Sequence, residues 1–191
     1  MDTVVSHSAP AAPAQLPAAL RRLYLLRSAF AALWAGLLFA TADRLGPLSG
    51  TLLVLYPLFD AACAVVDLRS ARGADGAVRR LSVNIALSVL AGIALAVALA
   101  SGIPAVLRVW GVWAVTAGIT QLAVGLARRR SGGQWPMILS GGISTLAGAS
   151  FILQAGKDDG ATLTNLAGYA FLGGAFFLAS ALRLKSVDRN D

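Results

Sequence analysis

The sequence predicts an all-α membrane protein of six transmembrane helices, arranged as three successive helical hairpins with both termini in the cytoplasm. Of its 191 residues, 57% are hydrophobic and only 13% are charged, and the mean hydropathy is +0.72. Soluble domains carry about 25% charged residues. Most of this chain is therefore built for a solvent other than water, and the lipid bilayer is its first expected partner.

Four stretches in the second part of the chain contain no Asp, Glu, Lys or Arg, namely 81–107, 109–127, 131–156 and 160–182. As helices, each can cross roughly 30 Å of hydrocarbon. The first part gives two more spans, because Gly46 and Pro47 after Asp43 and Arg44 predict a tight turn between apolar stretches. Arg27 is expected to snorkel to the inner surface. The expected spans are 23–42, 47–67, 81–101, 104–127, 135–154 and 163–184.

Basic residues are distributed unevenly between the two sides of these spans. With the N-terminus inside, 13 of the 16 Lys and Arg fall in cytoplasmic segments, and only Arg44, Arg108 and Lys157 lie outside. This asymmetry predicts an even number of spans with both termini inside, as expected for a protein of the bacterial inner membrane, and it accounts for the net charge of +7 without a nucleic-acid partner. We expect a disordered Ala/Pro-rich tail at 1–20, a membrane domain at 21–185 and a short cytoplasmic tail at 186–191.

An internal repeat of 56 residues predicts how the spans pack. The expected seam glycines are Gly36, Gly92 and Gly148 in the odd-numbered spans, and Gly118, Gly173 and Gly174 in the even-numbered ones. Eight residues before the first three stand Ser28, Asn84 and Ser140. Small residues four apart share one helix face and let two backbones approach in lipid. The sequence therefore predicts three parallel-related units, at about 23–72, 79–130 and 135–185.

The paired spans, the turns with Pro47 and Pro104, and the Arg-rich ends at 69–72 and 128–130 resemble the HdeD-like acid-resistance membrane proteins. The resemblance covers about residues 20–185, and the third unit departs from it because its turn, 157–159, lacks proline. It implies a short membrane repeat associated with survival of acid stress, without established catalytic residues. We therefore expect a non-catalytic protein that acts in acid or envelope stress, alone, as a homo-oligomer or with another membrane protein.

Asp60 is the main candidate for chemistry, because a carboxyl group about two turns inside a span is costly unless it is neutralised, hydrogen-bonded or water-exposed. At the repeat offset its counterparts are Thr116 and Leu172. Two interpretations are open. Asp60 is either the protonatable site of a small proton-coupled transporter or channel, or a structural group hydrogen-bonded by Asn84, Ser88 or Thr116. The candidate intramembrane proton or polar site comprises Asp60, Asn84, Thr116, Ser28 and Ser140.

Known enzyme classes are disfavoured by the residues that the chain lacks. His7 is the only histidine and lies in the tail, Cys63 is the only cysteine, and there is no Glu. These residues supply no haem-ligating pair, no thiolate metal cluster and no base for a serine nucleophile. No phosphate-binding loop or dinucleotide motif occurs. We expect no catalysis, no cofactor and no metal.

Large side chains near the span ends carry further expectations. Trp110 and Trp135 are predicted to lie in the interfacial aromatic belt, while Trp34, in mid-span, packs or faces lipid. Arg108 is expected to snorkel to phosphate headgroups.

Overall fold

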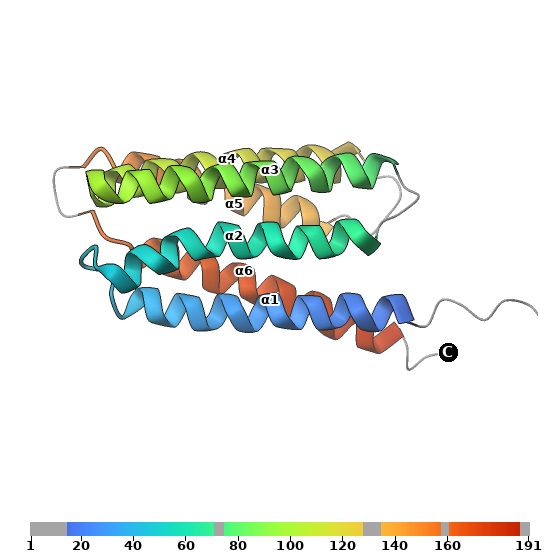
Figure 1. The fold of residues 1–191 in the computed structure, drawn as a ribbon. Coiled ribbons are helices and arrows are strands. Elements are labelled where there is room, and N and C mark those ends of the chain that lie inside the picture. The colour runs from blue at the N-terminus through green and yellow to red at the C-terminus, as the bar shows by residue number, and fades with distance from the viewer. Residues whose placement is uncertain (1–14, 71–74, 128–134, 158–160, 188–191) are drawn as a thin grey trace, which may run out of the picture.

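The computed structural model of the protein describes residues 15–70, 75–127, 135–157 and 161–187, which form a bundle of long helices (Figure 1). In chain order the elements are α1 (Gln15–Phe39), α2 (Pro47–Ser70), α3 (Asp75–Ala98), the 3₁₀ turn η1 (Leu99–Ser101), α4 (Ile103–Ala127), α5 (Trp135–Gln154) and α6 (Thr164–Val187). Within these ranges no strand occurs. The predicted all-α fold is therefore confirmed for the described residues.

Helix length and composition make the chain a multi-pass membrane protein. Among the described residues, α1, α2, α3, α4 and α6 each contain an apolar stretch of at least 19 residues, long enough to cross a membrane. The apolar stretch in α5, Ile138–Gln154, is shorter than those of the other five helices. Five spans thus follow directly from the helices, and the span predicted at 135–154 stays a prediction.

The helix ends differ slightly from the expected boundaries. Helix α1 begins at Gln15, so residues 15–20, expected in the tail, belong to the helix, as their content of Leu and Ala favours. Helix α6 continues to Val187, two residues past the predicted end of the membrane domain. The remaining predicted tail residues, 1–14 and 188–191, lie outside the described residues. Helix α1 begins and α6 ends at the same end of the bundle (Figure 1).

At the opposite end, the connection between α1 and α2 is held by backbone and side-chain contacts. The backbone N–H of Gly46 donates to Ser49 Oγ at 2.8 Å, and that hydroxyl donates to the carbonyl oxygen of Arg44 at 3.1 Å. The N–H of Leu163, just before α6, donates to the carbonyl oxygen of Ala42 at 3.1 Å. The turn is therefore fixed both to α2 and to the beginning of α6.

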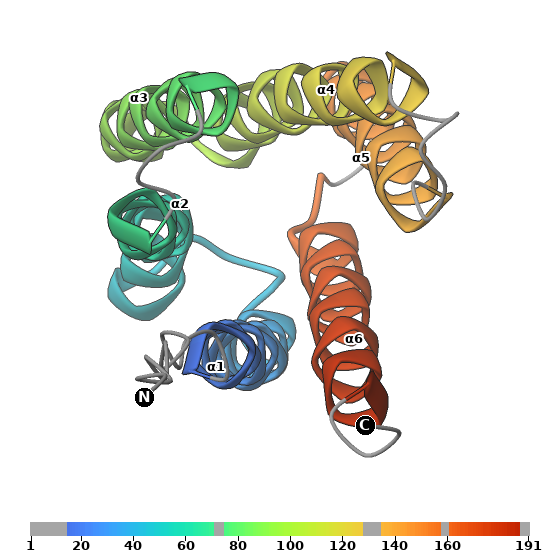
Figure 2. The same cartoon turned by 90° about the vertical axis from the view of Figure 1, so that its right-hand side faces the viewer.

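The helices follow one another around the bundle in chain order, and α6 closes the ring against α1 (Figure 2). The most extensive contacts join α4 to α5, α1 to α6 and α2 to α3. Contacts inside the predicted hairpins, α1–α2, α3–α4 and α5–α6, are smaller. The two helices of a predicted hairpin are thus connected by a turn, whereas the closest packing lies between one predicted hairpin and the next.

The apolar core occupies the half of the bundle that contains the α1–α2 turn, opposite the chain termini. Its buried members fall within 34–42, 52–53, 95–98, 106–110, 151–155 and 163–170. Trp34 and Trp110 are its largest side chains, each at most 1% exposed. The other half, towards the chain termini, contains the polar side chains described next.

Candidate functional site

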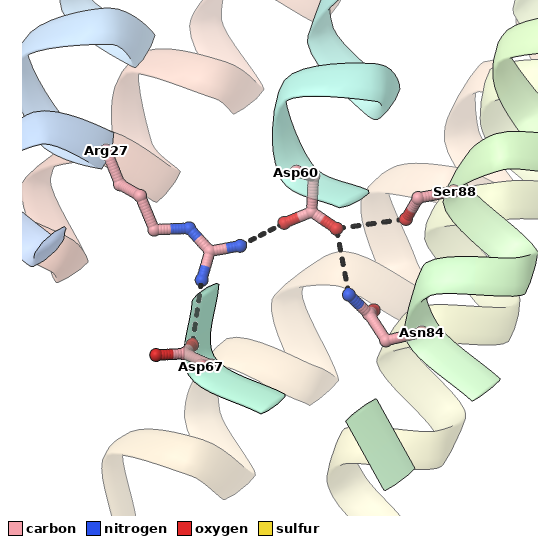
Figure 3. A network of polar contacts seen from close by, with 5 residues as sticks. All are labelled: Arg27, Asp60, Asp67, Asn84 and Ser88. Atoms are coloured by element: carbon pink, nitrogen blue, oxygen red, sulfur yellow. Dashed lines mark hydrogen bonds and ion pairs between the residues drawn. The ribbon is translucent and has the colours of Figure 1, made fainter. Parts of the chain in front are cut away.

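Arg27 and Asp60 form an ion pair between α1 and α2. The guanidinium Nη2 of Arg27 donates to Oδ1 of Asp60 (Figure 3), and the two side chains are 11% and 23% exposed. The guanidinium also lies 4.7 Å from the centroid of the Phe177 ring, a cation–π geometry that adds a contact to α6. The expectation that Arg27 snorkels to the inner surface is therefore wrong, because an acidic partner on the neighbouring helix holds its charge inside the bundle.

The second oxygen of Asp60 is bound by α3. Asn84 Nδ2 donates to Oδ2 at 3.0 Å, and Ser88 Oγ donates to the same oxygen at 2.9 Å. Asn84 and Ser88 are four residues apart, so they share one face of α3. The carboxylate thus accepts from three side chains and joins α1, α2 and α3 at one point (Figure 3).

Asp67 extends the network towards the end of the bundle that contains the termini. Its Oδ2 lies 3.7 Å from Nη1 of Arg27, and its side chain is 23% exposed. Asp60 and Asp67 are seven residues apart, close to two helical turns, so both carboxyl groups lie on one face of α2. Arg27 therefore stands between two carboxylates, one in the bundle and one nearer its end.

Of the three side chains predicted to hydrogen-bond Asp60, Asn84 and Ser88 do so. Thr116 instead donates to the carbonyl oxygen of Val112 in its own helix, at 2.7 Å. Ser28 and Ser140 are half-buried, and neither is among the side chains that bind Asp60 in the described parts of the chain. Arg27 and Asp67 were not predicted as site residues. Arg27 and the two aspartates carry opposite charges within neighbouring predicted spans. That pattern was the signal in the sequence, because a charge inside a span needs a partner of opposite sign.

Four aromatic rings fill the centre of the bundle beyond Asp60. Trp34 stacks on Trp110 with ring centroids 5.4 Å apart, and Tyr56 and Trp113 pack against this pair. The indole N–H of Trp34 donates to the carbonyl oxygen of Leu52 at 2.6 Å. The buried indole N–H groups of Trp110 and Trp113 have no hydrogen-bond partner in the described structure. Trp110 is 0% exposed, so its predicted place in the interfacial belt is wrong.

Two other side chains near the predicted span ends fit an exposed position. Trp135 is 78% exposed, and Arg108 is exposed. Arg108 also donates to the carbonyl oxygen of Ala155 at 3.2 Å, beyond the last residue of α5. That bond satisfies a carbonyl that the helix end leaves free.

Two of the six predicted seam glycines, Gly118 and Gly148, lie where two helix backbones meet. A Cβ atom at Gly118 would stand 2.6 Å from the backbone nitrogen of Thr145, and one at Gly148 would stand 2.6 Å from the carbonyl oxygen of Gly111. These contacts bring α4 and α5 together. Gly111 and Gly141, which the repeat did not single out, belong to the same contact; each lies seven residues from Gly118 or Gly148, and that spacing was a readable signal.

The other four predicted glycines differ in their contacts. A Cβ at Gly92 would lie 2.9 Å from Leu58 of α2, and one at Gly174 would lie 3.0 Å from Ala31 of α1. Gly173 has only the Tyr56 hydroxyl nearby, at 4.0 Å from its Cβ position. Gly36 has no such atom within 4 Å, so at this position the predicted seam is not a helix contact.

This arrangement connects α1, α2 and α3 through one ion pair and two hydrogen bonds. Among the described residues, no group of three or more His, Cys, Asp or Glu could hold a metal ion. Comparison with protein-family models, with curated proteins and with solved structures found no match to this chain.

Proposed function

We propose that the protein is a non-catalytic, multi-pass protein of the bacterial inner membrane that acts in acid or envelope stress as a rigid helical bundle, as its HdeD-like resemblance implies. The observation that carries this proposal is the full set of donors around Asp60. The carboxylate accepts from Arg27, Asn84 and Ser88, so its charge is neutralised and its oxygens are bound within the protein. A charge satisfied in this way connects helices and needs no solute.

The same proposal includes a topology of six spans with both termini in the cytoplasm. The positive-inside distribution supports it. The contacts of Gly118 and Gly174, 56 residues apart, support the proposed threefold repeat, because each packs against the next odd-numbered helix around the ring, α5 and α1 respectively. In this arrangement α5 is the fifth span.

The physiological part of the proposal is tested in a deletion strain. Survival of acid challenge, envelope permeability and membrane potential are measured with no gene, with wild type, and with the Arg27→Met/Asp60→Leu double variant, which keeps a helix contact without charges. If deletion causes a defect that wild type and the double variant both correct, the result supports a bundle whose role does not need a titrating carboxylate. An unchanged deletion strain contradicts the stress role.

A second function, a small proton-coupled transporter or channel, is favoured by one observation. Asp67 and Asp60 lie in sequence on one face of α2, with Arg27 between them, from the end of the bundle towards its centre. Liposomes containing wild type or Asp60→Asn, followed by pH-jump and solute-flux measurements, decide between the two functions. A flux that wild type supports and Asp60→Asn abolishes favours the transporter, whereas equal leak in both removes it.

A further inference from the structure

An apolar groove runs along α2 at the end of the bundle opposite the termini. Its volume is about 700 Å³, within the range of small-molecule sites. Carbon-rich side chains form most of its wall, including Leu45, Val54, Leu55, Leu58 and, from η1, Leu99. Leu55 and Leu58 are 43% and 40% exposed, so the groove is open at the side.

The groove exists because α2 diverges from α3 towards the turn that follows α1, as Figures 1 and 2 both show. Pro57 lies inside α2, where it removes one backbone hydrogen bond and favours a bend. Directly after Pro57, α2 meets α3, because Gly92 of α3 has no side chain and Leu58 occupies the space that a Cβ atom there would need. Near the beginning of α2, Gly50 likewise has no side chain and leaves space for Leu99 of η1. A bend and two small residues therefore shape the groove.

The surroundings decide what can occupy it. The groove opens sideways from a helix long and apolar enough to cross a membrane, so its natural contents are hydrocarbon chains. From Pro47 to Leu58 the helix rises roughly 17 Å, slightly more than half of the roughly 30 Å hydrocarbon layer. One acyl chain from the leaflet opposite the termini therefore matches the groove in depth.

Two charged residues outside the groove lining directly precede its first residue, Leu45. Asp43 and Arg44 are consecutive and exposed, directly before the groove residue Leu45. The hydrogen bonds of the turn to Ser49 and Leu163 hold this pair in place. Arg44 and the positive end of α2 suit a phosphate, and Asp43 suits an ammonium group. The local charge is thus balanced, as it is in a zwitterionic headgroup.

We propose that this groove binds one phospholipid with an ammonium-bearing zwitterionic headgroup, its acyl chain along Val54, Leu55 and Leu58 and its headgroup at Asp43 and Arg44. A bound lipid of this kind fills the space that the bend in α2 leaves beside α3. It also gives that end of the bundle a defined lipid contact in place of freely exchanging lipid.

Native mass spectrometry of the purified protein, titrated with phosphatidylethanolamine or phosphatidylglycerol, tests the proposal. Leu55→Trp fills the groove, and Leu48→Trp is its matched control, since Leu48 is on the same helix, 50% exposed and outside the groove lining. We expect wild type and Leu48→Trp to retain one phosphatidylethanolamine, and Leu55→Trp to bind it at least about tenfold more weakly. If Leu55→Trp lowers the thermal unfolding temperature, Thr51→Phe, also in the lining, replaces it.

Two headgroup variants complete the test. Asp43→Asn should remove the preference for phosphatidylethanolamine over phosphatidylglycerol, and Arg44→Gln should weaken both lipids. Equal lipid retention by wild type, Leu48→Trp, Leu55→Trp and Thr51→Phe would overturn the groove as the binding site. Equal binding of the two lipids by wild type would overturn the headgroup assignment.

Discussion

Arg27 of α1 and Asp60 of α2 share a hydrogen-bonded ion pair inside the bundle, and Asp60 passes this connection on to Asn84 and Ser88 of α3. Helix α2 packs against both α1 and α3, and this polar point fixes the position of all three helices relative to one another. In hydrocarbon such a point favours one packing arrangement over its alternatives, because any other arrangement leaves a charge without a partner.

The Arg27–Asp60 pair predicts strongly non-additive mutations. Arg27→Met or Asp60→Leu alone leaves the opposite charge unpaired, and each should lower the free energy of unfolding by about 3 kcal/mol. The double variant removes both charges and should recover most of that loss. Unfolding is followed by circular dichroism in mixed micelles, and a double variant that loses the sum of the single effects contradicts a direct pair.

Asp67 provides the control for this prediction. It lies 3.7 Å from the Arg27 guanidinium, beyond hydrogen-bond length, and closer to the end of the bundle than Asp60. Asp67→Asn should therefore cost no more than about 1 kcal/mol in the same assay. A loss as large as that of Asp60→Leu would show that Asp67 is the main partner of Arg27.

Gly118 and Gly142 predict opposite responses to the same substitution. At Gly118 an added Cβ meets the backbone of Thr145 and Gly141, so Gly118→Ala should lower stability by about 2 kcal/mol. At Gly142 no such atom lies within 4 Å, so Gly142→Ala should be neutral or stabilise by up to about 1 kcal/mol through helix propensity. Thermal unfolding of both variants in the same detergent measures the difference; equal losses would argue against the α4–α5 contact.

The tryptophans predict a difference that depends on one hydrogen bond. Trp34→Phe removes the indole that donates to Leu52, whereas Trp110→Phe removes a buried N–H without a partner in the described structure. Both substitutions take away the same ring volume. We therefore expect Trp34→Phe to be more destabilising by at least about 1 kcal/mol, with Trp113→Phe behaving like Trp110→Phe. Equal stabilities in chemical unfolding experiments would contradict this assignment.

Membrane topology gives a prediction independent of side-chain packing. In a Cys63→Ala background, single cysteines at Arg44 and Lys157 should react with a membrane-impermeant maleimide in intact cells. A cysteine at Arg79, near the opposite end of the bundle, should react only after the cells are opened. If the cysteine at position 79 reacts in intact cells, the proposed orientation is wrong. If the cysteine at position 157 does not react in intact cells, α5 does not cross the membrane as the fifth span.

The fold class was readable from the sequence because the bilayer imposes simple constraints. Hydrocarbon requires long apolar helices, and the spans expected from the charge-free stretches match the ends of α4, α5 and α6 to within three residues, whereas α3 begins six residues before its expected span. The position of Asp60 marked it for attention for the same reason, since an intramembrane carboxyl group needs a partner. Asn84 was identified with it through the repeat.

What the sequence alone left open is which faces meet, and only the tertiary structure decides this. Gly36 and Gly92 occupy equivalent places in the 56-residue repeat, yet Gly92 packs on Leu58 and Gly36 has no such neighbour. Arg27 and Trp110 near span ends read as interfacial residues, but Asp60 holds the first and Trp34 covers the second. Hydropathy specifies how many times the chain crosses the membrane, because the insertion of a segment into lipid depends on its composition. The rotation of each helix about its axis depends on side-chain contacts that form only when all the helices are assembled.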